Sequence, residues 1–253
     1  LPDPEPSPEP KPPPEPAPSP PEEEEESSEE EEEQKSKEEA SKEEEVREDD
    51  EWYYRSYSWH FDEEPYRAAG RTHQFSLDLA IRKSHYEELR ARDHRVPNDQ
   101  LVELVNEQLG HERISELAGK IRQISIEQGL DDLAEIHLAM AFTLSMPYAY
   151  DDKVYGREYP KFPVEMLVDQ EGDCTDFSSL CGALLYRLGH DVAYVLMTFT
   201  DKETGHAALG VRNPVPRGGH YVYKDNPKEK YYYCEVTPTS SATTETTTDV
   251  QWW

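Results

Sequence analysis

The sequence predicts an α+β fold in which N-terminal helices, including one that begins at a cysteine, pack on an antiparallel sheet. Three observations predict it. Apolar residues recur every three to four positions between residues 101 and 146, which is the period of helices that bury one face. A further apolar helix begins at Cys174. Short apolar or alternating segments follow between residues 192 and 237, as expected of strands after a set of helices.

Two strands and a short helix are expected before these helices. Residues 75–81 alternate apolar and polar side chains, which is the period of a half-buried strand. The segment 57–61, which is rich in aromatic residues, is expected to pair with that strand across a loop that holds Pro65 and Gly70. A short helix is expected to follow over residues 85–92.

Four helical segments are expected next. Residues 101–109 and 114–124 each place their large apolar side chains on one face. Residues 131–146 are too apolar for a surface element, so we expect a buried helix that ends at Pro147. The cysteine helix is expected over residues 174–188, with Gly189 as its C-cap.

The last part of the domain is expected to be an antiparallel meander. Residues 192–199 form an almost unbroken apolar run, as in a central strand that is buried on both faces. Residues 205–212, 220–224 and 231–237 are expected to follow as successive strands.

Residues 1–51 are expected to be a disordered acidic linker rich in proline and glutamate. Twelve of the 21 prolines lie in residues 1–21, and residues 1–50 hold 22 acids and 5 bases, a net charge of −17 out of the total of −29. Such a segment cannot bury enough apolar surface to fold, and its prolines favour an extended spacer. We interpret it as a solvated tether, with a specific acidic binding tail as the alternative. Residues 52–253 then form one domain with a core at about 99–237.

Composition argues against several classes of function. Lysine and arginine form no cluster, so we expect no binding to nucleic acid or to an anionic membrane. No apolar stretch approaches the roughly 20 residues that span a bilayer, so we expect no membrane insertion within this segment. The chain has no Cys-x-x-Cys pair and no glycine-rich phosphate loop, so we expect no metal and no cofactor. The oligomeric state stays open.

The location of the protein stays open between two alternatives. The absent initial methionine, the acidic stalk and the Thr-rich residues 237–248 suggest an extracytoplasmic domain cut from a membrane-anchored parent chain. A cytoplasmic protein with an acidic tether fits nearly as well.

The central motif is Gly-Asp-Cys-Thr-Asp at residues 172–176, at the start of the apolar helix. Asp173 occupies the N-cap and Asp176 follows three residues later, as in a capping box. Cys174 is therefore expected at the first helical position, where unsatisfied N–H groups and the helix dipole favour the thiolate. The alternative is a small core residue, but the apolar face begins later, at Leu180. We interpret Cys174 as a nucleophile supported by Asp173 and Asp176.

His206 and Glu235 are the expected partners of this cysteine. His206 lies in a Gly-His-Ala strand start whose small residues leave room beside the ring. His220 is the second choice for the base, and His190 is expected to be a solvated histidine after the cysteine helix. Neighbouring antiparallel strands would bring Glu235 opposite His206, where a carboxylate fixes the tautomer of the ring.

The remaining polar and cysteine residues receive other roles. An oxyanion is expected to bind the Cys174 backbone N–H and one further donor, for which Tyr155, Tyr159 and Gln170 are the candidates. Cys181 and Cys234 are expected to be packed small hydrophobes. A disulfide between them is conceivable, although an odd number of cysteines leaves at least one thiol free.

These segments resemble the transglutaminase-like superfamily of cysteine enzymes, in particular its microbial transglutaminase-like domain proteins. The resemblance runs through residues 141–148, 159–167, 172–176, 205–207 and 233–237. It implies a papain-like core and a Cys–His–acid triad, carried here by Cys174, His206 and Glu235. The acid is often aspartate in the wider superfamily, so this chain departs from the pattern with a longer side chain.

We therefore expect thiol-dependent acyl transfer on peptide or carboxamide bonds. Cys174 attacks the carbonyl carbon, His206 carries the proton, and water or an amine resolves the acyl-enzyme. Water makes the protein a cysteine protease or amidase, an amine makes it a transglutaminase, and the partner is a protein or peptide substrate. The alternative is a non-catalytic binding or scaffold domain of the same fold on a surface stalk.

Overall fold

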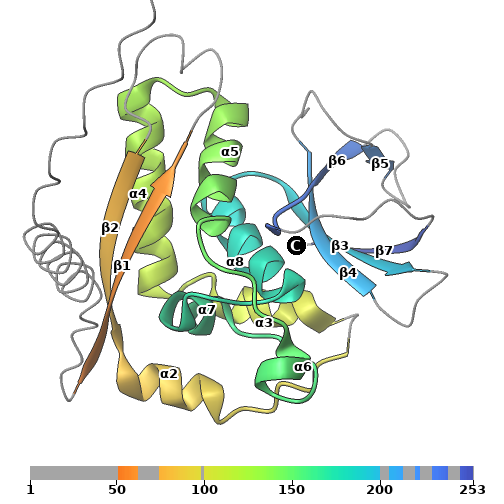
Figure 1. Ribbon diagram of the computed structural model, residues 1–253. Coiled ribbons are helices and arrows are strands. Elements are labelled where there is room, and N and C mark those ends of the chain that lie inside the picture. The colour runs from red at the N-terminus through yellow and green to blue at the C-terminus, as the bar shows by residue number, and fades with distance from the viewer. Residues whose placement is uncertain are drawn as a thin grey trace, which may run out of the picture. The chain divides into compact units, whose positions relative to one another are not determined.

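A strand pair opens the described chain, helices follow, and a sheet ends it, which confirms the predicted α+β class (Figure 1). The computed structural model describes residues 51–61, 74–97, 100–199, 205–212, 220–222, 230–238 and 246–252. The helices are α2 (Lys83–Arg90), α3 (Leu101–Gln108), α4 (Glu112–Gln128), α5 (Asp132–Thr143), α6 (Asp151–Val154), α7 (Pro163–Asp169) and α8 (Cys174–Arg187). Apart from Glu51, the expected disordered linker lies outside the described residues.

The first two strands, β1 (Trp52–His60) and β2 (Gln74–Arg82), pair antiparallel. The expected pairing of the two segments is present, with Trp59 opposite Phe75, and it continues to the start of β1. Trp59 is buried and meets Phe142 of α5 edge-on, with ring centroids 5.2 Å apart. The Tyr57 hydroxyl donates to the Leu167 carbonyl in α7. One face of the strand pair therefore packs on the helices.

Helix α8 is the central element of the described domain. Every residue from 176 to 185 is buried, because α3, α4, α5 and α7 pack on one side of the helix and β3 (Val192–Phe199) and β4 (Gly205–Val211) on the other. Figure 1 shows α8 between the helices and the second sheet. The predicted packing of the cysteine helix on an antiparallel sheet is thus confirmed.

The second sheet is antiparallel, but it is not the simple meander that we expect from the sequence. Its strand order is β5 (His220–Val222), β6 (Lys230–Cys234), β4, β3, β7 (Thr246–Trp252). The three-residue β5 lies at the edge, where short strands are tolerated, and the longer β6 takes the place beside β4. The sequence patterns did not predict β7, which pairs with β3. This order makes the strands of His206 and Cys234 direct neighbours.

The segment between the buried helix and α8 differs most from expectation. Helix α5 is capped at Asp131, the first residue of the expected helical segment, but it ends at Thr143, before Pro147. Two short helices, α6 and α7, lie between the segments expected over residues 131–146 and 174–188, where we predicted no helix. Helix α7 begins with Pro163 at its first position, where proline is well tolerated. None of the described helices is long and apolar enough to cross a membrane.

Candidate active site

The first turn of α8 holds Cys174 in a complete capping box. The Asp173 carboxylate accepts from the Thr175 N–H at 2.8 Å and the Asp176 N–H at 3.3 Å. In return, Asp176 accepts from the Asp173 N–H at 3.1 Å. Three backbone N–H groups at the helix start are thereby paired, and the predicted N-cap is present.

The Cys174 thiol is held in its neutral form, against the sequence-based expectation of a thiolate. Burial raises the pKa of the thiol to about 12, and the Asp173 carboxylate adds to the rise. Hydrogen bonds from the Ala207 backbone and the Tyr148 hydroxyl favour the thiolate but do not outweigh burial. Asp173 and Asp176 therefore support the helix start, whereas their charges oppose ionisation of the thiol.

His206 and Glu235 are joined by a direct hydrogen bond. The distance from His206 Nε2 to Glu235 Oε2 is 2.9 Å. Burial alone would raise the pKa of Glu235, but hydrogen bonds from His206, Thr237 and Tyr233 lower it to about 2. An ionised carboxylate can only accept, so the Nε2 of His206 carries a hydrogen and Nδ1 of the neutral ring has a lone pair.

The strand register explains why a glutamate, rather than a shorter acid, meets His206. Leu209 of β4 lies opposite Cys234 of β6. Continuing that register places Ala208 opposite Glu235, so His206 is one diagonal step away. Diagonal neighbours on a sheet face lie about 7–8 Å apart between Cα atoms. The longer glutamate side chain spans that distance.

The same strand contacts the thiol. Ala207 follows His206 in β4, and its backbone is hydrogen-bonded to Cys174. Helix α8 packs directly on β4. The structure therefore brings Cys174 beside the strand that carries His206, and it joins His206 to Glu235.

The three predicted oxyanion candidates have partners elsewhere. Gln170 donates its amide to the Ser56 carbonyl on β1 at 2.8 Å. Tyr159 donates its hydroxyl to Glu165 at 3.0 Å. The Tyr155 ring stacks on Tyr159 with centroids 4.1 Å apart. All three side chains thus take part in packing around α7 and β1 in this structure.

Tyr148 contacts the thiol residue directly, and the sequence patterns did not single it out. Its hydroxyl accepts from the Cys174 N–H at 3.3 Å. Tyr148 is bridged to Gly172, and the next residue, Ala149, donates its N–H to the Gly172 carbonyl at 2.8 Å. The only signal in the sequence was its place at the end of a segment that resembles the family, just after Pro147.

The other histidines and cysteines fall outside this cluster. His190 is buried and its Nε2 lies 3.2 Å from Glu135, so the expectation of a solvated histidine was wrong. It follows the C-terminal end of α8, whereas Cys174 begins that helix. Cys181 and Cys234 are buried, and all three cysteines are free thiols. The side chain of His220, the second choice for the base, is outside the described part.

One acidic cluster among the described residues has the spacing of a cation site. Carboxylate oxygens of Asp151, Asp173 and Asp176 all lie within 4.8 Å of one another. Each carboxylate accepts from a backbone N–H, and for Asp151 the donor is Tyr159 at 2.7 Å. Burial raises the pKa of Asp151 to about 7 and that of Asp173 to about 6. Backbone N–H groups therefore pair with all three carboxyls, and burial favours their protonated forms.

Residues 112–213 match the family model of the transglutaminase-like domain. The chain carries a transglutaminase-like domain. The matched span of the domain contains Cys174 and His206, and Glu235 lies beyond it.

No curated protein matches the chain. A solved structure titled "Crystal structure of a TGase" is 13% identical, with a TM-score of 0.36 over 68% of this chain and 43% of that one. The chain thus spans less than half of that structure. Because the TM-score is low, we base no conclusion on this similarity.

Proposed function

We propose that this protein catalyses thiol-dependent acyl transfer on peptide or carboxamide bonds, with Cys174 as nucleophile, His206 as base and Glu235 as the orienting acid. The observation that supports it is the 2.9 Å pair between His206 and Glu235 on the sheet whose β4 backbone contacts Cys174. A helix-start cysteine, a histidine and a carboxylate are the three groups that covalent thiol chemistry needs.

The proposed reaction runs through an acyl-enzyme. Nδ1 of His206 takes the thiol proton as the Cys174 sulfur bonds to the carbonyl carbon. The imidazolium, stabilised by Glu235, then gives that proton to the leaving amine as the C–N bond breaks. Water or a second amine attacks the thioester, His206 takes its proton, and the cysteine leaves as a thiol.

The neutral thiol makes this proton transfer part of the attack. At neutral pH a thiol with a pKa of about 12 is almost entirely protonated, so catalysis depends on general-base help from His206. The developing oxyanion would receive the Cys174 N–H that now donates to Tyr148. The Tyr148 hydroxyl, rotated to donate, supplies the second hydrogen bond.

The test is turnover of a glutamine-containing peptide by the full chain, with and without an added alkylamine. Released ammonia and product masses distinguish hydrolysis from amine transfer. We expect Cys174→Ala to abolish the reaction, and Cys181→Ala, a buried cysteine further along the same helix, to retain it. Activity that survives Cys174→Ala contradicts the proposal. Lack of both turnover and a Cys174 adduct with an activated acyl ester favours the non-catalytic binding domain instead.

A further inference from the structure

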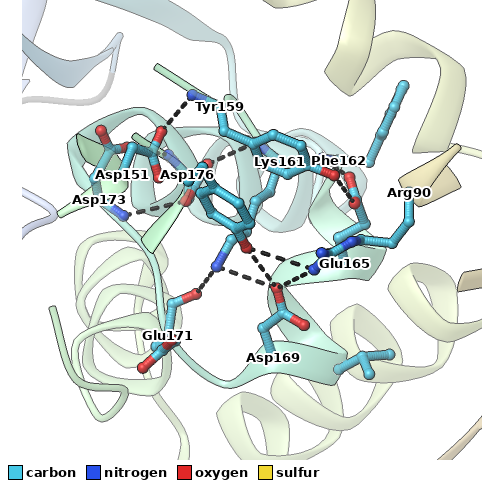
Figure 2. A network of polar contacts seen from close by, with 12 residues as sticks. Arg90, Asp151, Tyr159, Lys161, Phe162, Glu165, Asp169, Glu171, Asp173 and Asp176 are labelled. Carbon is cyan, nitrogen blue, oxygen red and sulfur yellow. Dashed lines mark hydrogen bonds and ion pairs between the residues drawn. The ribbon is translucent and has the colours of Figure 1, made fainter. Parts of the chain in front are cut away.

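Lys161 is a buried cation beside the turn that leads into Cys174 (Figure 2). Its side chain is 2% exposed. The ammonium donates to the Glu171 carbonyl at 2.8 Å and lies 3.2 Å from Asp169. The Lys161 backbone N–H donates to Asp176 at 2.7 Å. Two of these partners precede Cys174 and one follows it, so a single residue holds the helix start from both sides.

The loop that carries Lys161 is itself anchored to three helices. Each of its backbone N–H groups donates to a buried carboxylate: Tyr159 to Asp151 of α6, Lys161 to Asp176 of α8, and Phe162 to Glu165 of α7. Pro160, the remaining residue of the loop, has no N–H to pair. The loop therefore has little freedom to move, and it presents Lys161 at a fixed position.

The turn that Lys161 holds, residues 169–173, also contacts the neighbour of the thiol. The Gly172 carbonyl accepts from Ala149 at 2.8 Å, and Gly172 is bridged to Tyr148. Tyr148 in turn accepts from the Cys174 N–H. A shift of this turn would therefore move both Cys174 and Tyr148.

We propose that Lys161 is a positioning residue for Cys174, with its ammonium acting through the turn at residues 169–173 and its backbone N–H acting through Asp176. Its effect on turnover rests on the function proposed above, whereas its effect on the accessibility of the thiol does not.

The charge of Lys161 is suited to this role. Burial would lower the pKa of its ammonium, but the carboxylates of Asp176 and Asp169 raise it, so the side chain stays charged. A methionine at this position keeps an unbranched side chain but removes the donor, and a buried acceptor without its donor is costly. Lys161→Met should therefore release the Glu171 carbonyl and Asp169 and loosen the turn.

The experiment measures alkylation of the three free cysteines by iodoacetamide in the folded full chain, resolved by peptide mass spectrometry. In Lys161→Met we expect Cys174 to react at least about threefold faster, because local opening exposes the first turn of α8. Cys181 and Cys234 should keep their slow rates, since they report on opening of the core. Turnover should fall by roughly tenfold to a hundredfold through misplacement of the nucleophile. Lys120→Met, an exposed lysine on α4, is the matched control.

A double-mutant cycle with Asp169→Asn tests the route of the effect, because Asp169 is the carboxylate 3.2 Å from the Lys161 ammonium. The contact with Asp176 comes from the Lys161 backbone N–H and survives Lys161→Met. If Lys161 acts through Asp169, the two substitutions change the Cys174 rate by less together than the product of their separate effects. Independent effects overturn that route. An unchanged Cys174 rate, or an equal rise at all three cysteines, overturns the positioning role. If Lys161→Met does not fold, Lys161→Arg keeps the charge and must retain the wild-type ratio of Cys174 to Cys181 rates.

Discussion

At the scale of single residues, the electrostatics of Cys174 decide how the proposed chemistry can begin. A charge near a helix end changes stability by about 0.3–1 kcal/mol, and by ~2 kcal/mol in favourable buried cases. The rise of the thiol pKa from 9.0 to about 12 corresponds to roughly 4 kcal/mol. Burial and Asp173 therefore outweigh the helix terminus, and the base has to remove the proton during attack.

Replacing Glu235 by glutamine tests the orienting role of the acid. Both oxygens of Glu235 accept hydrogen bonds, from His206 and Tyr233 on one and from Thr237 on the other. An amide turns one acceptor into a donor, so the tautomer of His206 is no longer fixed. We expect kcat to fall by about 10²–10⁴-fold, measured with the glutamine peptide. Glu103→Gln, an exposed glutamate on α3, should leave kcat unchanged.

Glu235→Gln also tests how the free energy of unfolding depends on pH. The folded pKa of Glu235, about 2, lies below the unfolded value of about 4.3. Its stabilising contribution is therefore complete above about pH 5 and is lost as the pH falls toward 2. Urea unfolding should show Glu235→Gln less stable than wild type at pH 7, and this difference in unfolding free energy should become smaller as the pH falls. A difference that stays constant down to pH 2 contradicts the lowered pKa of Glu235.

At the scale of elements, the approach of the turn to α8 depends on one glycine. A Cβ placed on Gly172 would lie 2.6 Å from both Cβ and Oδ2 of Asp176. Only a residue without a side chain fits between the turn and the first turn of the helix. The capping box and the bridge to Tyr148 both rely on that fit.

Gly172→Ala should therefore be destabilising. We expect the free energy of unfolding to fall by about 1–3 kcal/mol, the usual cost of overpacking, and urea denaturation measures it. Gly119→Ala is the matched control, because a Cβ there meets nothing within 4 Å in the middle of α4. That control should gain roughly 0.5–1 kcal/mol from helix propensity. Equal effects of the two substitutions would show that the close approach is not important.

Local patterns predicted the start of α8 well, because Asp173, Cys174 and Asp176 interact within a single turn. Helix α7 was missed because it has seven residues and follows a proline-rich segment that is typical of a loop. Tyr148 was missed because its contact with Cys174 depends on a bridge to a residue 24 positions later. The strand order was wrong in part because spacing along the chain does not specify which neighbour a short edge strand takes.

At the scale of the whole molecule, the acidic balance of the chain extends into the interior near the thiol. Asp151, Asp173 and Asp176 are buried together, and the backbone N–H of Lys161 donates to Asp176. Burial raises the pKa of all three carboxyls. The folded domain thus binds protons more tightly at this cluster than the unfolded chain does, which links its stability to pH.

Asp151→Asn isolates that linkage. The folded pKa of Asp151 is about 7, above the unfolded value of about 3.9. Asp151 therefore makes its full contribution to folding stability when the pH is below its unfolded pKa. This contribution is lost as the pH rises through 7. The asparagine cannot ionise and still accepts from Tyr159, so we expect this variant to exceed wild type in unfolding free energy by roughly 2–4 kcal/mol at pH 8. The gap should shrink as the pH falls to 4, in urea titrations at matched ionic strength. Asp152→Asn, a substitution at the exposed neighbour, should follow the wild-type dependence of stability on pH. If Asp151→Asn stabilises the protein equally at pH 8 and pH 4, the buried cluster does not control the pH dependence.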